Sequence, residues 1–448
     1  MSASNPVRFP DVHEPAVMTR RAWWLIALNF LIPGSAQLLA GNRRLGRLGV
    51  RATALLWFLG IVAVIVFLVA RSALIGIATN PIALTVGQVL LAGYAVLWIA
   101  LTFDTLRLVR LIRTGPTARP FIAGLAVLAL VATAGTAGYG AYLAGVTRST
   151  VSAIFGSGEY QEPVDGRYNI LMLGGDAGPD RLGMRPDSLS VVSVDAATGA
   201  ATMIGVPRNF EHVRFTAGSP LYGPFPNGYD CGDDCLISYL YTYAEEHPDL
   251  YPDAHAHGSS PGIEATRDAI AGVLGIKLQY FALIDMKGFS DLVDALDGIT
   301  IDVKKRQPLA GSENSKGEPT NIVGWIEPGV QKMDGATALW YARARHGSSD
   351  FDRMARQRDV QEAILKQFKP ATVLRKFQDI AEAGTQIVKT DIPSVMLGVF
   401  VDLAAKARTQ PITRLEIVPP GFDPARPDYP KIEAAVAEAL KPRPTPSG

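Results

Sequence analysis

Long apolar runs fill the first third of the chain, whereas shorter alternating and helical patterns fill the remainder. Three of these runs reach the roughly 20 residues that a membrane-crossing helix needs. They lie at about residues 50–70, 83–103 and 121–146. A fourth run, residues 22–40, is of similar length but contains Asn29, Pro33 and Gln37. The pattern predicts an N-terminal multi-helix membrane region followed by a folded domain.

Arginines set the expected orientation of these segments. They cluster at Arg20 and Arg21, at Arg43, Arg44, Arg47 and Arg51, and at Arg107, Arg110, Arg113 and Arg119. The loop near residues 71–82 has only Arg71. By the positive-inside rule the clusters face the cytoplasm, so three crossings place the C-terminal domain outside. Because arginines flank both ends of residues 22–40, we expect a re-entrant or interfacial hairpin there. Four true crossings would instead leave the C-terminal domain inside.

These patterns divide the chain into five parts. We expect a cytoplasmic N-terminus (1–21), a membrane region (22–146, with the hairpin at 22–40), a linker (147–166), an extracytoplasmic domain (167–440) and a disordered tail (441–448). The linker is expected because residues 147–166 are rich in Ser, Gly and Thr.

Strand and helix patterns alternate after residue 167. Strands are predicted at residues 168–176, 188–195, 201–206, 280–285, 299–303 and 415–419. Helices are predicted at residues 261–274, 286–298, 336–346, 352–368 and 430–440. In the helix 261–274, Ser260 is the expected N-cap, Pro261 the first helical residue and Gly275 the stop. This alternation predicts an α/β domain with helices around a central sheet.

Composition narrows the function classes. Of 448 residues, 48% are hydrophobic, and the formal net charge is +1. A chain so close to neutral predicts no polyanion-binding surface, so nucleic acid is not an expected partner. The sequence also contains no Walker motif, G-x-S-x-G or H-E-x-x-H. A basic site, if present, must be local.

The only two cysteines, Cys231 and Cys235, lie four residues apart in "DCGDDC". This spacing fits a disulfide, half of a metal site or two free thiols. No second cysteine pair completes a zinc site, so we favour the disulfide, provided that the segment lies outside the cytoplasm.

Aspartates and arginines collect at the predicted ends of strands, which is where α/β proteins place their sites. Asp176 closes the first strand, Arg185 and Asp187 stand just before the second, and Arg208 follows the third. Arg343 ends the apolar stripe of the helix that begins near residue 336, together with Ala336, Leu339 and Trp340.

The segment "SSDFDRMARQRDVQ" adds further cations. Six residues share one helical face: Arg353, Arg356, Gln357, Val360, Ile364 and Phe368. The inward face therefore begins with arginines. Asp350 as an N-cap with solvated arginines is the simpler alternative. Buried arginines, however, need an anion, and arginine forks suit phosphate oxygens. Two carboxylates suit Mg²⁺, which bridges phosphates. A pyrophosphate with its bound Mg²⁺ therefore fits both the arginines and the aspartates.

In these motifs the domain resembles the LytR-CpsA-Psr family of cell-wall ligases. The resemblance covers about residues 165–370 and rests on "NILMLGGD", "RPDSLSVVSVD", "GVPRN", "FALIDMKGFSDLVDALDGITIDV", "DGATALWYARAR" and "SDFDRMARQ", in this order. The extended N-terminal membrane region is similar to that of actinobacterial members. One departure is Asn209, where the family usually carries aspartate.

The resemblance implies a central mixed sheet and a phosphotransferase (EC 2.7.8-like) at the cell membrane, multi-pass, with its catalytic domain outside. Such an enzyme moves a glycopolymer from a polyprenyl-pyrophosphate carrier onto a peptidoglycan sugar and uses no nucleotide. Asp176 and Asp187 would hold Mg²⁺. Asp350 and Gln357 would position the acceptor, with Asp350 as general base. The residues expected around the pyrophosphate are Arg185, Arg208, Arg343, Arg345 and Arg353, and Arg356 is added as a substrate-binding residue.

The carrier's chain would need an apolar groove, for which residues 263–274 and 293–301 are candidate linings. Two other activities use the same pocket. The protein could bind polyprenyl phosphates as an envelope regulator without turnover, or it could hydrolyse the pyrophosphate. Intact magnesium ligands and Asp350 favour an enzyme over a binder. A purely structural exterior domain is the remaining alternative.

Overall fold

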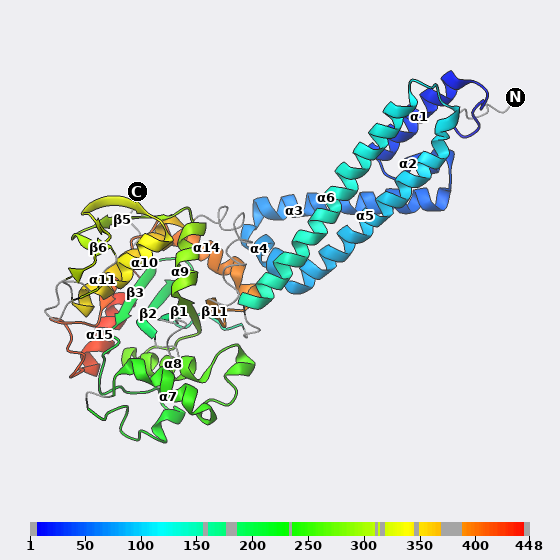
Figure 1. Cartoon of the computed structure of the whole chain (residues 1–448). Coiled ribbons are helices and arrows are strands. Elements are labelled where there is room, and N and C mark those ends of the chain that lie inside the picture. The colour runs from blue at the N-terminus through cyan, green and yellow to red at the C-terminus, as the bar shows by residue number, and fades with distance from the viewer. Residues whose placement is uncertain are drawn as a thin grey trace. The chain divides into compact units, whose positions relative to one another are not determined.

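The computed structural model describes residues 7–155, 160–175, 186–232, 235–309, 312–313, 319–344, 349–368 and 388–442. The chain divides into two compact units, Met1–Ser149 and Thr150–Gly448 (Figure 1). Each unit is described separately below.

The first unit is helical. Its helices are α1 (Pro15–Leu31), α2 (Ser35–Ala40), α3 (Arg43–Val69), α4 (Arg71–Thr79), α5 (Pro81–Val109), the 3-10 turn η1 (Leu111–Arg113) and α6 (Arg119–Ile154). Three described stretches are long and apolar enough to cross a membrane: Arg43–Val69, Pro81–Arg113 and Arg119–Ser149. They contain the three predicted crossings. The predicted loop near residues 71–82 holds the short helix α4.

Helices α1 and α2 form a hairpin along the last turns of α5. Asn29 Nδ2 donates to Thr102 Oγ1 (3.3 Å), and Gln37 Nε2 donates to the carbonyl of Leu101 (2.8 Å). The chain turns back at Gly34, whose φ of 92° suits glycine and whose missing Cβ would lie 2.5 Å from the Gly46 carbonyl oxygen. Amides bonded to a neighbouring helix are what a hairpin in an apolar environment requires.

The second unit is built on a six-stranded sheet of order β11-β4-β1-β2-β3-β12. The strands are β1 (Arg167–Gly175), β2 (Pro186–Asp195), β3 (Ala201–Val206), β4 (Tyr280–Asp285), β11 (Val388–Thr390) and β12 (Thr413–Glu416). β1 pairs parallel with β4, and β3 pairs parallel with β12, whereas β2 is antiparallel to both of its neighbours. The sheet is therefore mixed, as expected.

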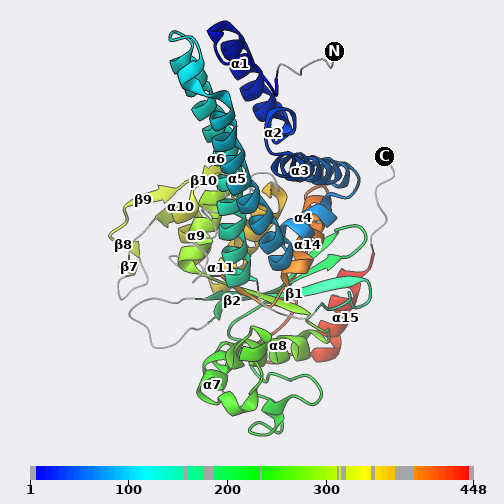
Figure 2. The same ribbon diagram turned by 90° about the vertical axis from the view of Figure 1, so that its right-hand side faces the viewer.

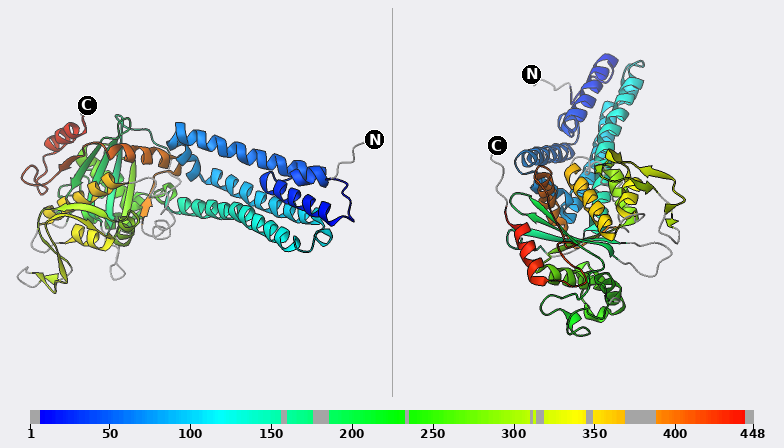
Figure 3. Two further views of the ribbon diagram at one scale, coloured as in Figure 1. Left: turned by 90° about the horizontal axis from the view of Figure 1, so that it is seen from above. Right: turned by 90° about the vertical axis from the view of Figure 1, so that its left-hand side faces the viewer.

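Helices cover both faces of this sheet (Figures 2 and 3). One face packs α7 (Leu240–Glu246), α8 (Pro261–Leu274) and α15 (Tyr429–Leu440) into the largest apolar core. The other face carries α9 (Met286–Ala295), α10 (Gly335–Arg343), α11 (Asp350–Gln367) and α14 (Leu397–Ala407). The predicted α/β fold class is confirmed.

Short elements complete the second unit. β5 (Ile299–Val303) pairs with β10 (Gly329–Met333), β6 (Gln307–Leu309) with β9 (Gly324–Ile326), and β7 (Ser312–Glu313) with β8 (Pro319–Thr320). The 3-10 turns are η2 (Pro220–Tyr222), η3 (Ile237–Tyr239), η4 (Pro248–Leu250), η5 (His255–His257) and η6 (Ser394–Met396).

The segment expected to form a linker, residues 147–166, differs most from expectation. α6 continues through Ile154, into the residues expected to form a linker. Farther on in the same stretch, the backbone N–H of Gln161 donates to the hydroxyl of Tyr280 (2.8 Å), so this residue is tied to the domain. Glycine and serine content alone did not reveal these contacts. Residues 443–448 of the expected tail lie outside the described part of the chain.

Candidate active site

Three strand ends meet at one edge of the sheet. Because β2 runs antiparallel between β1 and β3, its first residues lie beside the last residues of both neighbours. Asp187 is the second residue of β2, and Arg208 follows the end of β3 by two residues. The sequence prediction placed both residues at strand ends, and the topology brings those ends together.

Helix α11 presents its N-terminus to the same edge. Its N-cap is Ser349, whose hydroxyl accepts from the backbone N–H of Asp352, while the Asp352 carboxylate accepts from the backbone N–H of Ser349. This capping box corrects the alternative in which Asp350 is the cap. The carboxylate of Asp350 is used in other contacts.

Asp350 joins two arginines. Its Oδ2 lies 3.4 Å from Arg208 Nε, and its Oδ1 lies 3.4 Å from Arg353 Nη1. Arg208 Nη1 also donates to Asp187 Oδ1 at 2.7 Å. The result is a continuous chain of charges, Asp187, Arg208, Asp350 and Arg353, drawn from β2, the end of β3 and α11.

This cluster is partly open to solvent at one end and closed at the other. The side chains of Asp187, Arg208 and Asp350 are 29%, 30% and 36% exposed, whereas Arg353 is 4% exposed. Burial acts to lower the pKa of Arg208, but Asp187 and Asp350 outweigh it, so the pKa is raised. Arg208 therefore stays cationic.

Arg356 has a different position from that expected of a substrate-binding residue. Its guanidinium is 6% exposed and donates from Nε to the carbonyl of Tyr341 (2.9 Å) and from Nη2 to the carbonyl of Ala344. Burial lowers its pKa. Arg356 thus holds the end of α10 against α11, next to the segment that carries Arg345.

Helix α10 is rotated relative to the sequence prediction. Its buried residues are Gly335, Ala338, Tyr341 and Ala342, whereas Ala336 and Arg343 are exposed. The predicted apolar stripe ending in Arg343 is therefore wrong. Trp340 was counted as part of the predicted apolar stripe. It is only half-buried, and its indole N–H donates to the carbonyl of Pro308 (2.6 Å).

Two amide side chains beside the cluster have unused acceptors. Gln357 lies one turn after Arg353 on α11, and Asn209 follows Arg208 directly. Within the described residues, Gln357 Oε1 and Asn209 Oδ1 are buried and accept no hydrogen bond. Buried acceptors without partners carry a cost, so a side-chain movement that brings either oxygen to a ligand donor would be favourable.

Sequence reasoning missed Arg358, the largest fully buried side chain of the described chain. Its Nε lies 3.6 Å from Glu416 Oε1, and its Nη2 lies 3.4 Å from the hydroxyl of Ser188, the neighbour of Asp187. Gly205 leaves the space for the Glu416 carboxylate, since a Cβ there would overlap Oε2. No periodicity signals this pair, because its partners lie on different elements.

Three predicted site residues, Asp176, Arg185 and Arg345, lie outside the described residues. The two cysteines lie in the loop between β3 and η3. Cys231 and Cys235 form a disulfide with a Cα–Cα distance of 5.2 Å.

Comparison with known proteins decides the family. The model of the LytR_cpsA_psr family matches residues 147–419, which is more than half of the chain. The chain belongs to the LytR-CpsA-Psr family. The match includes every strand of the six-stranded sheet and all of the charge cluster described above.

Curated relatives of this family member carry two kinds of name. A "Polyisoprenyl-teichoic acid--peptidoglycan teichoic acid transferase TagU" from Halalkalibacterium halodurans is 28% identical over 227 residues, 50% of this chain and 61% of that protein. A "Regulatory protein MsrR" from Staphylococcus aureus is 29% identical over 240 residues, 52% of this chain and 60% of that protein. The matched part thus spans about three fifths of these relatives.

Solved structures of similar proteins include B. subtilis TagV, with a TM-score of 0.44 and 21% identity, covering 64% of this chain and all of that one. Another is a structure described as TagT bound to LI-WTA, with a TM-score of 0.41 and 18% identity, covering 63% of this chain and 92% of that one.

In the described structure, the apolar side chains of both candidate groove linings of this LytR-CpsA-Psr domain belong to its cores. Residues 263–274 form most of α8, nearly all of which is buried in the largest core. Within residues 293–301, Val293, Ile299 and Ile301 belong to the core beneath α10 and α11. Periodicity predicted apolar faces here, and both faces are filled by the domain's own side chains.

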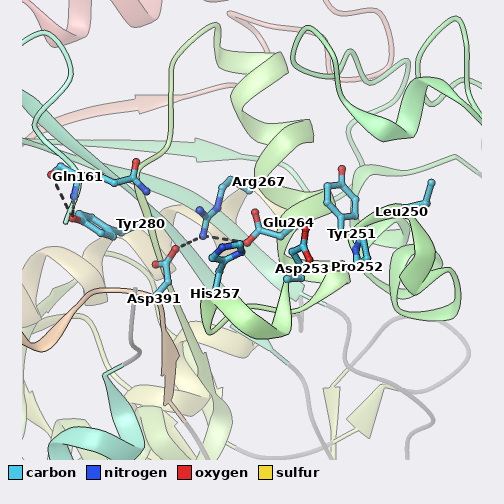
Figure 4. A pocket seen from close by; sticks show the side chains of 11 residues that line it. Gln161, Leu250, Tyr251, Pro252, Asp253, His257, Glu264, Arg267, Tyr280 and Asp391 are labelled. Atoms are coloured by element: carbon cyan, nitrogen blue, oxygen red, sulfur yellow. Dashed lines mark hydrogen bonds and ion pairs between the residues drawn. The ribbon is translucent and has the colours of Figure 1, made fainter. Parts of the chain in front are cut away.

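A separate pocket of about 390 Å³ lies at the opposite end of the sheet (Figure 4). Tyr280, at the start of β4, lines it, and β4 runs parallel to β1, whose end approaches the charge cluster. Arg267 in its wall pairs with Asp391 at 2.5 Å and with Glu264 at 3.4 Å. Two carboxylates face one guanidinium here, so this pocket has no excess positive charge for a phosphate. It is distinct from the candidate active site because it lies at the other end of the parallel strands β1 and β4.

Proposed function

We propose that this chain is a phosphotransferase that moves a glycopolymer from a polyprenyl-pyrophosphate carrier onto peptidoglycan, outside the membrane. The observation that carries the proposal is the cluster of Arg208 and Arg353, two permanently charged forks held by Asp187 and Asp350 at one sheet edge. A pyrophosphate is an anion that such forks bind bidentately.

The geometry supports exchange of partners within the cluster. Arg208 contacts Asp350 at 3.4 Å, which is long for a charge-assisted hydrogen bond, so phosphate oxygens can compete for the same N–H groups. Arg353 is almost fully desolvated, which strengthens its interaction with charge that develops on the leaving group. Arg185, Arg343 and Arg345 complete the proposed phosphate-binding set.

We assign the activation and positioning of the acceptor sugar to Asp350 and to the side-chain amides of Gln357 and Asn209. Asp350 takes the proton of the sugar hydroxyl as the hydroxyl oxygen attacks the phosphorus next to the glycopolymer. A new sugar–phosphate ester bond forms, the bond to the polyprenyl phosphate breaks, and polyprenyl phosphate leaves. The unused acceptors of Gln357 and Asn209 can orient neighbouring hydroxyls of the sugar.

Magnesium remains part of the proposal through Asp187, with Asp176 expected beside it. Within the described residues, no group of three or more His, Cys, Asp or Glu side chains could hold a metal. Asp187 still fits, because Mg²⁺ is commonly held by one or two carboxylates together with waters and substrate phosphates. A bound Mg²⁺ would neutralise charge on the pyrophosphate.

Names of relatives support transfer over regulation alone. TagU relatives are named as teichoic acid transferases acting on peptidoglycan, whereas MsrR is named as a regulator. A binder of polyprenyl phosphates needs the arginines but has no use for a carboxylate aimed at an acceptor. We therefore place this chain with the transferases, as a multi-pass membrane protein with its catalytic domain outside.

The test uses the full chain in detergent with a polyprenyl-pyrophosphate-linked oligosaccharide, Mg²⁺ and peptidoglycan fragments, followed by mass spectrometry. We expect a sugar-phosphate adduct on the acceptor. Arg353→Ala should lower its rate by about 100-fold or more, because a preorganised charge is lost from the transition state. The matched control is Arg426→Ala, which removes an exposed arginine outside the cluster.

Other products would contradict the proposal in defined ways. Released sugar phosphate without an adduct would identify a pyrophosphate hydrolase. Tight binding of the carrier without turnover would identify a regulator. Equal activity of Arg353→Ala and Arg426→Ala would mean that the cluster is not the active site.

A further inference from the structure

The first unit contains a cavity of about 430 Å³, whose residues have no role in the proposed chemistry. Its walls come from the first turns of α1 and from the short segment before α6. The residues that matter below are Thr19, Arg20 and Trp23 on α1, and Gly115 and Thr117 on the opposite wall. The cavity thus combines a guanidinium, an indole and a hydroxyl.

The two walls are held together before any ligand binds. The backbone N–H of Gly115 donates to Thr19 Oγ1 at 2.9 Å across 96 residues of sequence. Arg21, which is 8% exposed, donates to the carbonyls of Val7 (2.7 Å) and Leu108 (2.6 Å). Its neighbour Arg20 is exposed and lines the cavity. One arginine fixes the wall, and the other remains at the opening.

The hairpin contacts place this cavity at a defined depth along the helices. Arg21 contacts Leu108 near the end of α5, and Asn29 contacts Thr102, six residues earlier on the same helix. At 1.5 Å per residue, α1 runs about 9 Å along α5 between these two contacts. The cavity therefore lies at the arginine-rich end of α5, beyond Leu108.

Exposed aromatic and aliphatic side chains surround this end. Trp23 and Trp24 are 39% and 58% exposed, and Ile112 is 85% exposed. Tryptophans are enriched at the level of lipid headgroups, where the ring is apolar on one side and wet on the other. These side chains identify the surroundings of the cavity as a bilayer interface, so its ligand should be amphipathic.

The charge balance at this end calls for an anion. Arg20, Arg110 and Arg113 are exposed there, and the cavity lining itself, which begins at Pro15 directly after Glu14, contains no acidic residue. Arg119 donates to the carbonyls of Ile112 and Thr114, so it keeps its full charge. Phosphate is the anion that a bilayer supplies at headgroup depth.

We propose that this cavity binds the phosphate headgroup of an anionic membrane phospholipid. Arg20 donates to the phosphate, Thr117 donates its hydroxyl to the same group, and the Trp23 ring packs against the glycerol and first acyl carbons. The bound lipid would fill the gap between α1 and the segment before α6, and so hold α1 in place.

The experiment is native mass spectrometry of the full chain in mild detergent, titrated with phosphatidylglycerol and, separately, phosphatidylcholine. We expect one tightly bound phosphatidylglycerol. Arg20→Gln should weaken its binding about five- to tenfold, because one headgroup contact to a cation is lost. The matched control, Arg44→Gln, removes another exposed arginine of the same unit, outside the cavity, and should change binding little.

Several results would overturn the proposal. They are equal binding of both lipids, unchanged binding in Arg20→Gln, and equal losses in Arg20→Gln and Arg44→Gln, which would indicate diffuse surface charge. Full competition by soluble glycerol phosphate would assign the site to a free phosphate instead. If Arg20→Gln lowers the melting temperature, Trp23→Ala is the second variant. Unchanged lipid binding by Trp23→Ala would contradict the packing of the Trp23 ring against the lipid.

Discussion

Three arginines on α11 carry the same charge and do three different things. Arg353 meets Asp350 at the sheet edge, Arg356 binds two backbone carbonyls of α10, and Arg358 is buried against Glu416. Their roles follow from direction, since positions 353, 356 and 358 leave the helix at different angles. A residue type alone does not define a site residue.

Arg356→Lys tests the anchoring role. A lysine ammonium lacks the fork that reaches two carbonyls, so we expect a loss of about 2–3 kcal/mol of stability from the missing charged hydrogen bonds. Transfer activity should fall with it, because the end of α10 loses its anchor on α11. Thermal unfolding and the adduct assay measure the two effects. Full activity with an unchanged melting temperature would contradict this role.

Glu416 makes stability depend on pH. Burial raises its pKa above the ordinary 4.5, and Arg358 and Arg414 only partly offset burial. An acid that holds its proton more tightly in the fold stabilises the fold below its ordinary pKa, and this contribution is lost as pH rises through the raised value. As the pH rises from 4.5, the parent should therefore lose more melting temperature than Glu416→Gln, which has no carboxylate to ionise at this position. Identical profiles would contradict the assignment.

Sequence periodicity identified Arg353 and Val360 as inward-facing, and both are buried. It could not identify Arg358, whose partner Glu416 lies on a strand reached only through the fold. The prediction for Arg343 was wrong for a different reason: α10 buries the face of Ala338 and Tyr341, and leaves Arg343 exposed. A local sequence pattern predicts which face of a helix is buried. Ion pairs between distant elements can be predicted only when the topology of the fold is known.

At the scale of elements, the predicted strands and helices of the second unit are present with small shifts at their ends. α8 begins and ends as predicted, at Pro261 and before Gly275. Its cap differs: Glu245 of α7 accepts from the backbone N–H of Gly262 (3.0 Å), while Ser260 makes no side-chain cap. The capping box of α11 is likewise formed by Ser349, so Asp350 remains available to the arginines.

Packing between β3 and β12 provides a direct test. Gly205→Ala introduces a Cβ where the Glu416 carboxylate lies, so we expect overpacking to cost about 1–3 kcal/mol. Adding Glu416→Ala removes the clash, so the double variant should be more stable than the sum of the single effects predicts. Chemical denaturation of all four forms measures the coupling. Simple additivity would show that the two positions do not interact.

The whole molecule combines a helical unit with an α/β unit. The three long apolar helices and the LytR-CpsA-Psr domain fit a membrane protein with an extracellular domain. Hydropathy was sufficient to predict these helices, because a bilayer requires long apolar runs. The bonded amides of the hairpin were not predictable, since their partners lie on α5.

Topology is tested by a reporter fused after Gly448, combined with thiol labelling. We expect an extracytoplasmic signal, because the arginine clusters place the second unit outside. Cys231 and Cys235 should resist alkylation until a reductant is added, since they are joined in a disulfide. A cytoplasmic reporter signal would contradict three crossings. Free thiols without reductant would contradict the disulfide.

The contact between Gly205 and Glu416 also constrains how this chain can change over generations. A side chain at position 205 requires the carboxylate at position 416 to move aside, to be shortened or to be lost. That loss would in turn leave Arg358 buried without its counter-charge. Positions 205, 358 and 416, far apart in sequence, should therefore covary: we expect related chains either to keep all three residues or to replace them together.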